Sequence, residues 1–149
     1  MKAAVLGVLL AQRVAARCGM WTYALVSLPG TVAHEFAHYL AGVALLARPR
    51  FPSLWPVQTT DGWRLGSVSF HATVWRAVPI AMAPFLLMLL SLWWADEFLT
   101  PAMGHHFWVH AWIVGTLLNG SLPSRADFGL VVPAVLLTAT TVISVAVWL

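Results

Sequence analysis

The sequence predicts an all-α membrane protein with about four to five transmembrane helices and a short β-hairpin on the cytoplasmic side. Of its 149 residues, 60% are apolar and only 9% are charged, and the mean hydropathy is +0.82. Soluble domains carry about 25% charged residues, so these charges are too few to cover a water-exposed surface. The composition therefore excludes a soluble globular protein and a disordered chain, and the length favours a single membrane domain over residues 1–149.

The expected helices are apolar stretches, of which about 20 residues cross a membrane. Val74–Trp94 and Phe128–Leu149 meet this length almost without charge. Residues 19–47 are apolar but broken by a Pro-Gly pair, and residues 105–119 precede a cluster of turn-forming residues. Residues 3–28 form either one long helix or a shorter interfacial helix, and we expect this segment to be retained rather than cleaved.

The loop over residues 48–76 contains a sequence typical of a β-hairpin. Asp61-Gly62 is typical of a two-residue turn, and residues 51–60 and 63–71 on either side are rich in Trp, Val, Phe and Ser. The alternative is an ordered interfacial loop that Trp55 and Trp63 anchor to the membrane.

Basic residues predict the orientation. The net charge of +3 comes from eight Lys and Arg, which in a membrane protein mark cytoplasmic loops rather than a nucleic-acid surface. Four Arg lie in residues 48–76 and one lies in residues 120–127, whereas residues 95–106 hold two acids and no Lys or Arg. We therefore expect the first two segments inside and the third outside.

His34, Glu35 and His38 form the motif with the clearest chemical meaning. Positions i and i+4 share one face of a helix, so both imidazoles can bind one metal ion, and Glu35 would act as general base. Ionisable groups inside a span cost about 2.5 kcal/mol or more each, which favours a functional site over a polar packing cluster. His38 lies ten residues before Arg48, or about 15 Å along a helix from the cytoplasmic boundary.

A catalytic zinc site usually has three protein ligands, and Asp127 is the best candidate for the third. The helix expected at 107–119 reaches only about 20 Å, so the turn after it should lie inside the membrane, near the level of the two histidines. The competing interpretation is a helix cap, because residues 124–127 fit the S-x-x-D capping pattern.

Other polar residues are weaker candidates. Asn119 could donate a hydrogen bond to a developing oxyanion, or simply form a turn. His71 closes the expected hairpin and is more simply a structural side chain. His106 and His110 are also four residues apart, but no glutamate lies between them, so we interpret them as interfacial histidines.

Residues 28–41, LPGTVAHEFAHYLA, resemble the metal-binding helix of the site-2 protease family of intramembrane zinc metalloproteases. Residues 123–127, PSRAD, are similar to the Pro-Ser-x-x-Asp element of small bacterial members, although Phe128 replaces the commoner glycine after the aspartate. Ala83-Pro84 is similar to a Gly-Pro pair of the family. The resemblance implies a bacterial inner-membrane enzyme whose one Zn²⁺ ion is held by His34, His38 and Asp127 and whose active site opens to the cytoplasm.

The sequence thus predicts a zinc-dependent intramembrane endopeptidase that hydrolyses a peptide bond in or near a transmembrane segment of a membrane protein. Its expected partners are the lipid bilayer and a membrane protein or peptide substrate, which the edge of the hairpin could hold extended. Two alternatives stay open. One is a non-proteolytic metal-binding or transport protein, and the other is a haem-binding subunit that uses His34 or His38 with His106 or His110.

Overall fold

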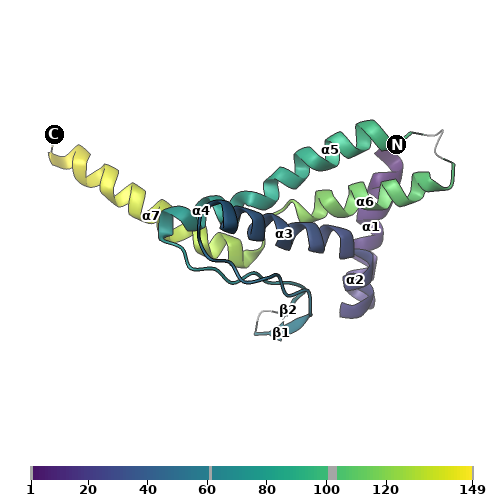
Figure 1. Cartoon of the computed structure of the whole chain (residues 1–149), viewed down its shortest axis with the longest axis horizontal. Helices are drawn as coiled ribbons and strands as arrows, with labels where there is room; N and C mark the ends of the chain where they lie inside the picture. The colour runs from purple at the N-terminus through teal and green to yellow at the C-terminus, as the bar shows by residue number, and fades with distance from the viewer. Residues whose placement is uncertain (1, 61, 101–103, 149) are drawn as a thin grey trace.

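The computed structural model describes residues 2–60, 62–100 and 104–148, with side chains up to residue 140 (Figure 1). Most of this part of the chain is helical. In chain order the elements are α1 (Lys2–Cys18), α2 (Met20–Val26), α3 (Leu28–Ala44), β1 (Val57–Thr59), β2 (Gly62–Arg64), α4 (Val74–Met82), the 3₁₀ helix η1 (Ala83–Phe85), α5 (Leu86–Phe98), α6 (His106–Gly120) and α7 (Arg125–Trp148). The prediction of a helical fold with one short β-hairpin is confirmed.

Glycine and proline set the ends of the first three helices. Gly19 has a φ of 139°, which glycine adopts readily and other residues avoid, and α1 ends just before it. The possibility of one uninterrupted helix over residues 3–28 is therefore wrong. α2 and α3 meet at Ser27, and Pro29 lies in the first turn of α3, where its missing N–H leaves no helical hydrogen bond unmade.

Two segments are long and apolar enough to cross a membrane. α4, η1 and α5 together form the first, Val74–Phe98, whose 25 residues reach about 37 Å, more than the roughly 30 Å hydrocarbon core. The second, His106–Thr140, joins α6 to most of α7 and is interrupted by a turn at residues 121–124. These are the two such segments in the described part of the chain, so four to five spans stay a prediction.

α3 and α6 pack closely because their contact is made of glycine. α6 also packs against α5 and α1, and α4 packs against α7, whose far half projects away from the other helices (Figure 1). A Cβ on Gly120 would lie 2.6 Å from the carbonyl oxygen of Gly30, and a Cβ on Gly30 would overlap the carbonyl oxygen of Thr116. Small residues let helix backbones approach in this way. The contact brings His34, one turn after Gly30, to the end of α6.

Replacing Gly30 with alanine is expected to push α3 away from α6 and to weaken metal binding. Overpacking of this kind lowers the free energy of unfolding by about 1–3 kcal/mol, and the shift would move His34 from the end of α6. Thermal unfolding and bound metal per chain measure the two effects. Gly7→Ala, which adds its Cβ in open space on α1, is the control. Unchanged metal content in Gly30→Ala would show that the site does not depend on this contact.

β1 and β2 form the expected hairpin, but Gly62 belongs to the second strand and not to the turn. Thr59 pairs with Gly62, the first residue of β2. Asp61 itself lies outside the described residues. Backbone hydrogen bonds continue the pairing irregularly toward the base of the hairpin, through Ser53 with Ser67, Arg50 with Ser69, and Ala47 with His71. The two long arms run alongside α3 (Figure 1).

Candidate metal centre

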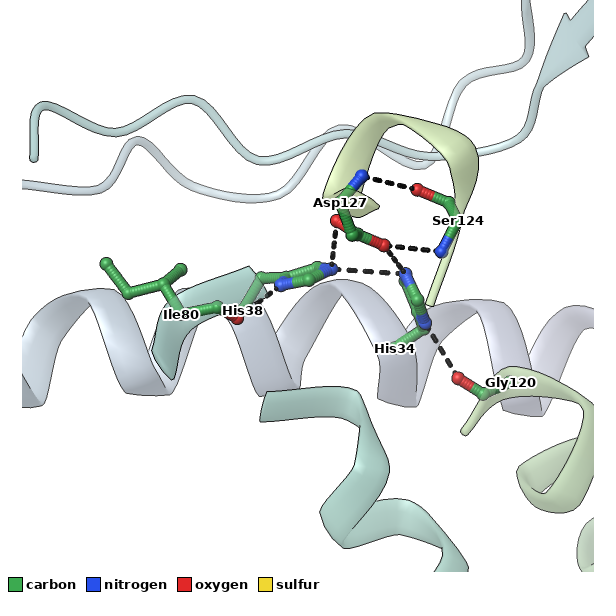
Figure 2. A network of polar contacts seen from close by, with 6 residues as sticks. All are labelled: His34, His38, Ile80, Gly120, Ser124 and Asp127. Carbon is green, nitrogen blue, oxygen red and sulfur yellow. Dashed lines mark hydrogen bonds and ion pairs between the residues drawn. The ribbon is translucent and has the colours of Figure 1, made fainter. Parts of the chain in front are cut away.

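Three side chains from two distant parts of the chain converge at one point (Figure 2). His34 and His38 project from one face of α3, and Asp127 comes from the first turn of α7. The Nε2 atoms of the two histidines are 3.1 Å apart. Asp127 Oδ1 lies 3.1 Å from His38 Nε2, and Asp127 Oδ2 lies 3.5 Å from His34 Nε2. The three ligand atoms lie within 4.8 Å of one another, so the group could hold a metal ion.

Two backbone carbonyl groups orient the histidines. His34 Nδ1 donates to the carbonyl oxygen of Gly120 at 2.7 Å, and His38 Nδ1 donates to that of Ile80 at 2.8 Å. A carbonyl oxygen only accepts, so each Nδ1 carries a hydrogen and each neutral ring presents the Nε2 lone pair to the centre. Such outer hydrogen bonds set the tautomer of a metal-binding histidine.

Proline removes one backbone donor that would compete for each of these carbonyl groups. In an α-helix the carbonyl of Ile80 would accept from residue 84, but Pro84 has no N–H, so this carbonyl accepts from the backbone N–H of Ala83 and keeps its second lone pair for His38. Gly120 ends α6, and residue 123, which could close a last tight turn, is also a proline. The Ala83-Pro84 pair therefore has a local physical role: it leaves the Ile80 carbonyl able to accept the hydrogen bond that orients His38.

The separations of the three ligand atoms fit a metal ion. Two imidazole lone pairs and a carboxylate at 3.1–3.5 Å repel unless a proton or a metal ion lies between them. Ligands about 2.0–2.1 Å from one zinc ion in tetrahedral geometry would stand about 3.3–3.4 Å apart, close to these separations. Two nitrogens and one oxygen are also a ligand set that zinc commonly takes in catalytic sites.

Asp127 is placed to act both as a ligand and as a helix cap. Its Oδ2 accepts the backbone N–H of Ser124 at 2.6 Å, and Ser124 Oγ accepts the backbone N–H of Asp127 at 3.3 Å. These reciprocal bonds form a capping box at the start of α7. The two interpretations that the sequence left open are therefore compatible, because the cap holds the carboxylate in the direction of the histidines (Figure 2).

Glu35 lies beside the centre in a cavity of about 690 Å³ between α3, the second arm of the hairpin and the start of α7. The cavity lining includes the three ligand residues, Glu35 and residues 62–68. Glu35 is 7% exposed, and no hydrogen bond or ion pair to its carboxylate is found in the described part of the chain. It is thus held close to the ligands without being committed to another group.

Glu35 packs against the backbone of Gly66, a contact that the sequence did not reveal. A Cβ at Gly66 would lie 2.6 Å from Glu35 Oε1. We expect Gly66→Ala to displace the carboxylate, because the nearest atoms to the added Cβ all belong to Glu35. Bound metal should stay unchanged. The structure of the variant and its metal content are determined together, with Gly7→Ala as the control, and an unmoved Glu35 carboxylate in Gly66→Ala would contradict the expectation.

The structure does not bring the remaining candidates to the centre. Asn119 is absent from the cavity lining, and its amide nitrogen donates to Gln12 Oε1 at 2.9 Å and to the Tyr23 hydroxyl at 3.1 Å. His71 is also absent from the lining and pairs through its backbone with Ala47 at the base of the hairpin.

His106 and His110 lie away from the cavity. His110 accepts a hydrogen bond from Trp94 at 3.3 Å and stacks on Phe98, with ring centroids 5.6 Å apart. His106 packs against His105. Within the described residues, His34, His38 and Asp127 are the group that meets the geometry of a metal site. The site therefore defines a helical protein with a candidate metal centre made of two histidines and one aspartate.

No protein-family model, curated protein or solved structure matches this chain.

Proposed function

We propose that this chain is a zinc-dependent intramembrane endopeptidase that hydrolyses a peptide bond in or near a transmembrane segment of a membrane protein. The observation that carries the proposal is the position of Glu35. It is adjacent to a ligand in the sequence and lines the same cavity as all three ligands, and its carboxylate makes no hydrogen bond or ion pair with a described residue. A structural metal site would need the three ligands but not this carboxylate.

Each residue of the site has a separate role in the proposed reaction. His34, His38 and Asp127 would hold the ion. A bound zinc ion would supply Lewis-acid polarisation and lower the pKa of water toward about 7. Glu35 takes a proton from the attacking water and passes it to the amine that leaves when the peptide C–N bond breaks.

The exposed apolar surface of the helices supports a location in a membrane. Large apolar side chains are more than half exposed on α5 and α7, among them Leu86, Leu89, Leu92, Val135 and Leu136. A monomeric soluble protein rarely exposes so much contiguous apolar surface. We therefore propose that α3, the α4–α5 segment, α6 and α7 each cross the bilayer, with α1 as a fifth span, to give four to five spans. The Arg-containing loops would face the cytoplasm, and from the resemblance to site-2 proteases we propose a bacterial inner membrane.

The test is metal analysis and hydrolysis by the purified full chain in detergent. We expect one zinc ion per chain and cleavage of unfolded casein or of fluorescent single-span peptides. A chelator should abolish cleavage, and added Zn²⁺ should restore it, whereas Fe²⁺, which also binds two histidines and a carboxylate, should not. A chain that holds its metal but cleaves none of these substrates would overturn the proposal. Metal flux through liposomes containing the protein would then favour the transport alternative.

A further inference from the structure

A network of two amides, one buried and one half-buried, connects α1, α6 and α2. Gln12 of α1 is only 2% exposed, and its Nε2 donates to the carbonyl oxygen of Gly115 at 3.3 Å. Asn119 of α6 then donates to Gln12 Oε1 and to the hydroxyl of Tyr23 on α2. A buried amide is destabilising unless its hydrogen bonds are made, which suggests that this network has a role other than packing.

The direction of every hydrogen bond in this network follows from the carbonyl group of Gly115. The Gly115 oxygen can only accept, so Gln12 presents its Nε2 to Gly115 and its Oε1 to Asn119. Asn119 must therefore face Gln12 with its NH₂ group, whose second hydrogen goes to Tyr23. The Tyr23 oxygen is thus an acceptor, and its own proton is left to donate elsewhere.

The hydroxyl proton of Tyr23 can be donated into the cavity. Tyr23 lines the same cavity as His34 and Glu35, and no acceptor for its hydroxyl proton is found among the described residues. The position of α2 is held by Trp112, whose ring N–H donates to the Val26 carbonyl oxygen at 2.7 Å. A hydroxyl that accepts one hydrogen bond is polarised and becomes a stronger donor.

We infer that Tyr23 donates a hydrogen bond to the oxyanion that develops on the substrate carbonyl, and that Gln12 and Asn119 are positioning residues that aim it. The inference rests on the proposed peptidase function and deepens it. The sequence suggests Asn119 for this role. In the structure Asn119 donates both amide hydrogens, one to Gln12 and one to Tyr23. The donor to the oxyanion is therefore Tyr23, the next residue in the hydrogen-bond network.

Tyr23→Phe tests the inference because it removes only the hydroxyl. We expect kcat to fall by about 10- to 1,000-fold, the range in which oxyanion donors act, with KM and zinc content unchanged. The affinity for a peptide phosphinate, which carries a tetrahedral anion, should fall at least about 10-fold, measured by isothermal titration calorimetry. The chain's other tyrosine supplies the control: Tyr39 packs against Phe36 and Phe51, and Tyr39→Phe should change neither value.

Asn119→Asp tests the direction of the hydrogen bonds in this network. A carboxylate at 119 would accept the Tyr23 proton and turn the donor away from the cavity, so kcat should fall as in Tyr23→Phe. The double variant should lose little more than either single one. Tyr23→Phe with wild-type kcat and phosphinate affinity would overturn the inference. If the wild-type chain cleaves nothing but Tyr23→Phe still weakens phosphinate binding, the peptidase proposal fails and the anion contact of Tyr23 stands.

Discussion

Glu35→Gln is expected to abolish hydrolysis while the chain keeps its metal. Glutamine has nearly the same shape, so the packing against Gly66 is retained, but it cannot accept a proton at neutral pH. Loss of a general acid–base typically lowers turnover by about 10²- to 10⁴-fold. Single-turnover cleavage and metal content, measured on the same preparation, separate the two effects.

The chain offers a matched control for this substitution. Its other glutamate is Glu97, near the end of α5 and outside the cavity lining, so Glu97→Gln should behave as wild type. Loss of metal from Glu35→Gln would make Glu35 a ligand and contradict the assignment. Retained cleavage would contradict its role as general base.

Asp127→Asn is expected to remove the metal while keeping most of the helix cap. The amide oxygen can still accept the N–H of Ser124, but the charge that faces the two histidines is lost. Losing a ligand should weaken metal binding by more than the roughly 10- to 100-fold that follows loss of an outer-shell partner. Competition with a zinc-sensitive dye measures this affinity.

Ser124→Ala makes the opposite change at the same helix end. It removes the side-chain bond to the Asp127 N–H and should lower the free energy of unfolding by about 0.5–2 kcal/mol, while most of the bound metal is retained. Asp96→Asn, outside the cavity lining, is the control for charge alone. If Asp127→Asn and Ser124→Ala lose metal equally, Asp127 acts as a cap and not as a ligand.

Local patterns in the sequence predicted the parts of the site that depend on neighbours along the chain. The spacing of His34 and His38 placed both on one helix face because helical periodicity is a local property. The S-x-x-D pattern located the start of α7 for the same reason, and the turn-forming residues located the hairpin. The apolar composition identified the helical class, while the number of spans stays a prediction.

What the sequence by itself determined is therefore the class of fold, the histidine pair with its glutamate, and a short list of further candidates. Only the tertiary structure decided among them, because side-chain hydrogen bonds and helix contacts join residues far apart in the chain. It brought Asp127 to the histidines through the capping box, supplied the Ile80 and Gly120 carbonyls, and turned Asn119 away toward Gln12 and Tyr23. These outcomes depend on how closely glycine lets α3 approach α6 and on which donors proline removes, and neither can be read from local periodicity.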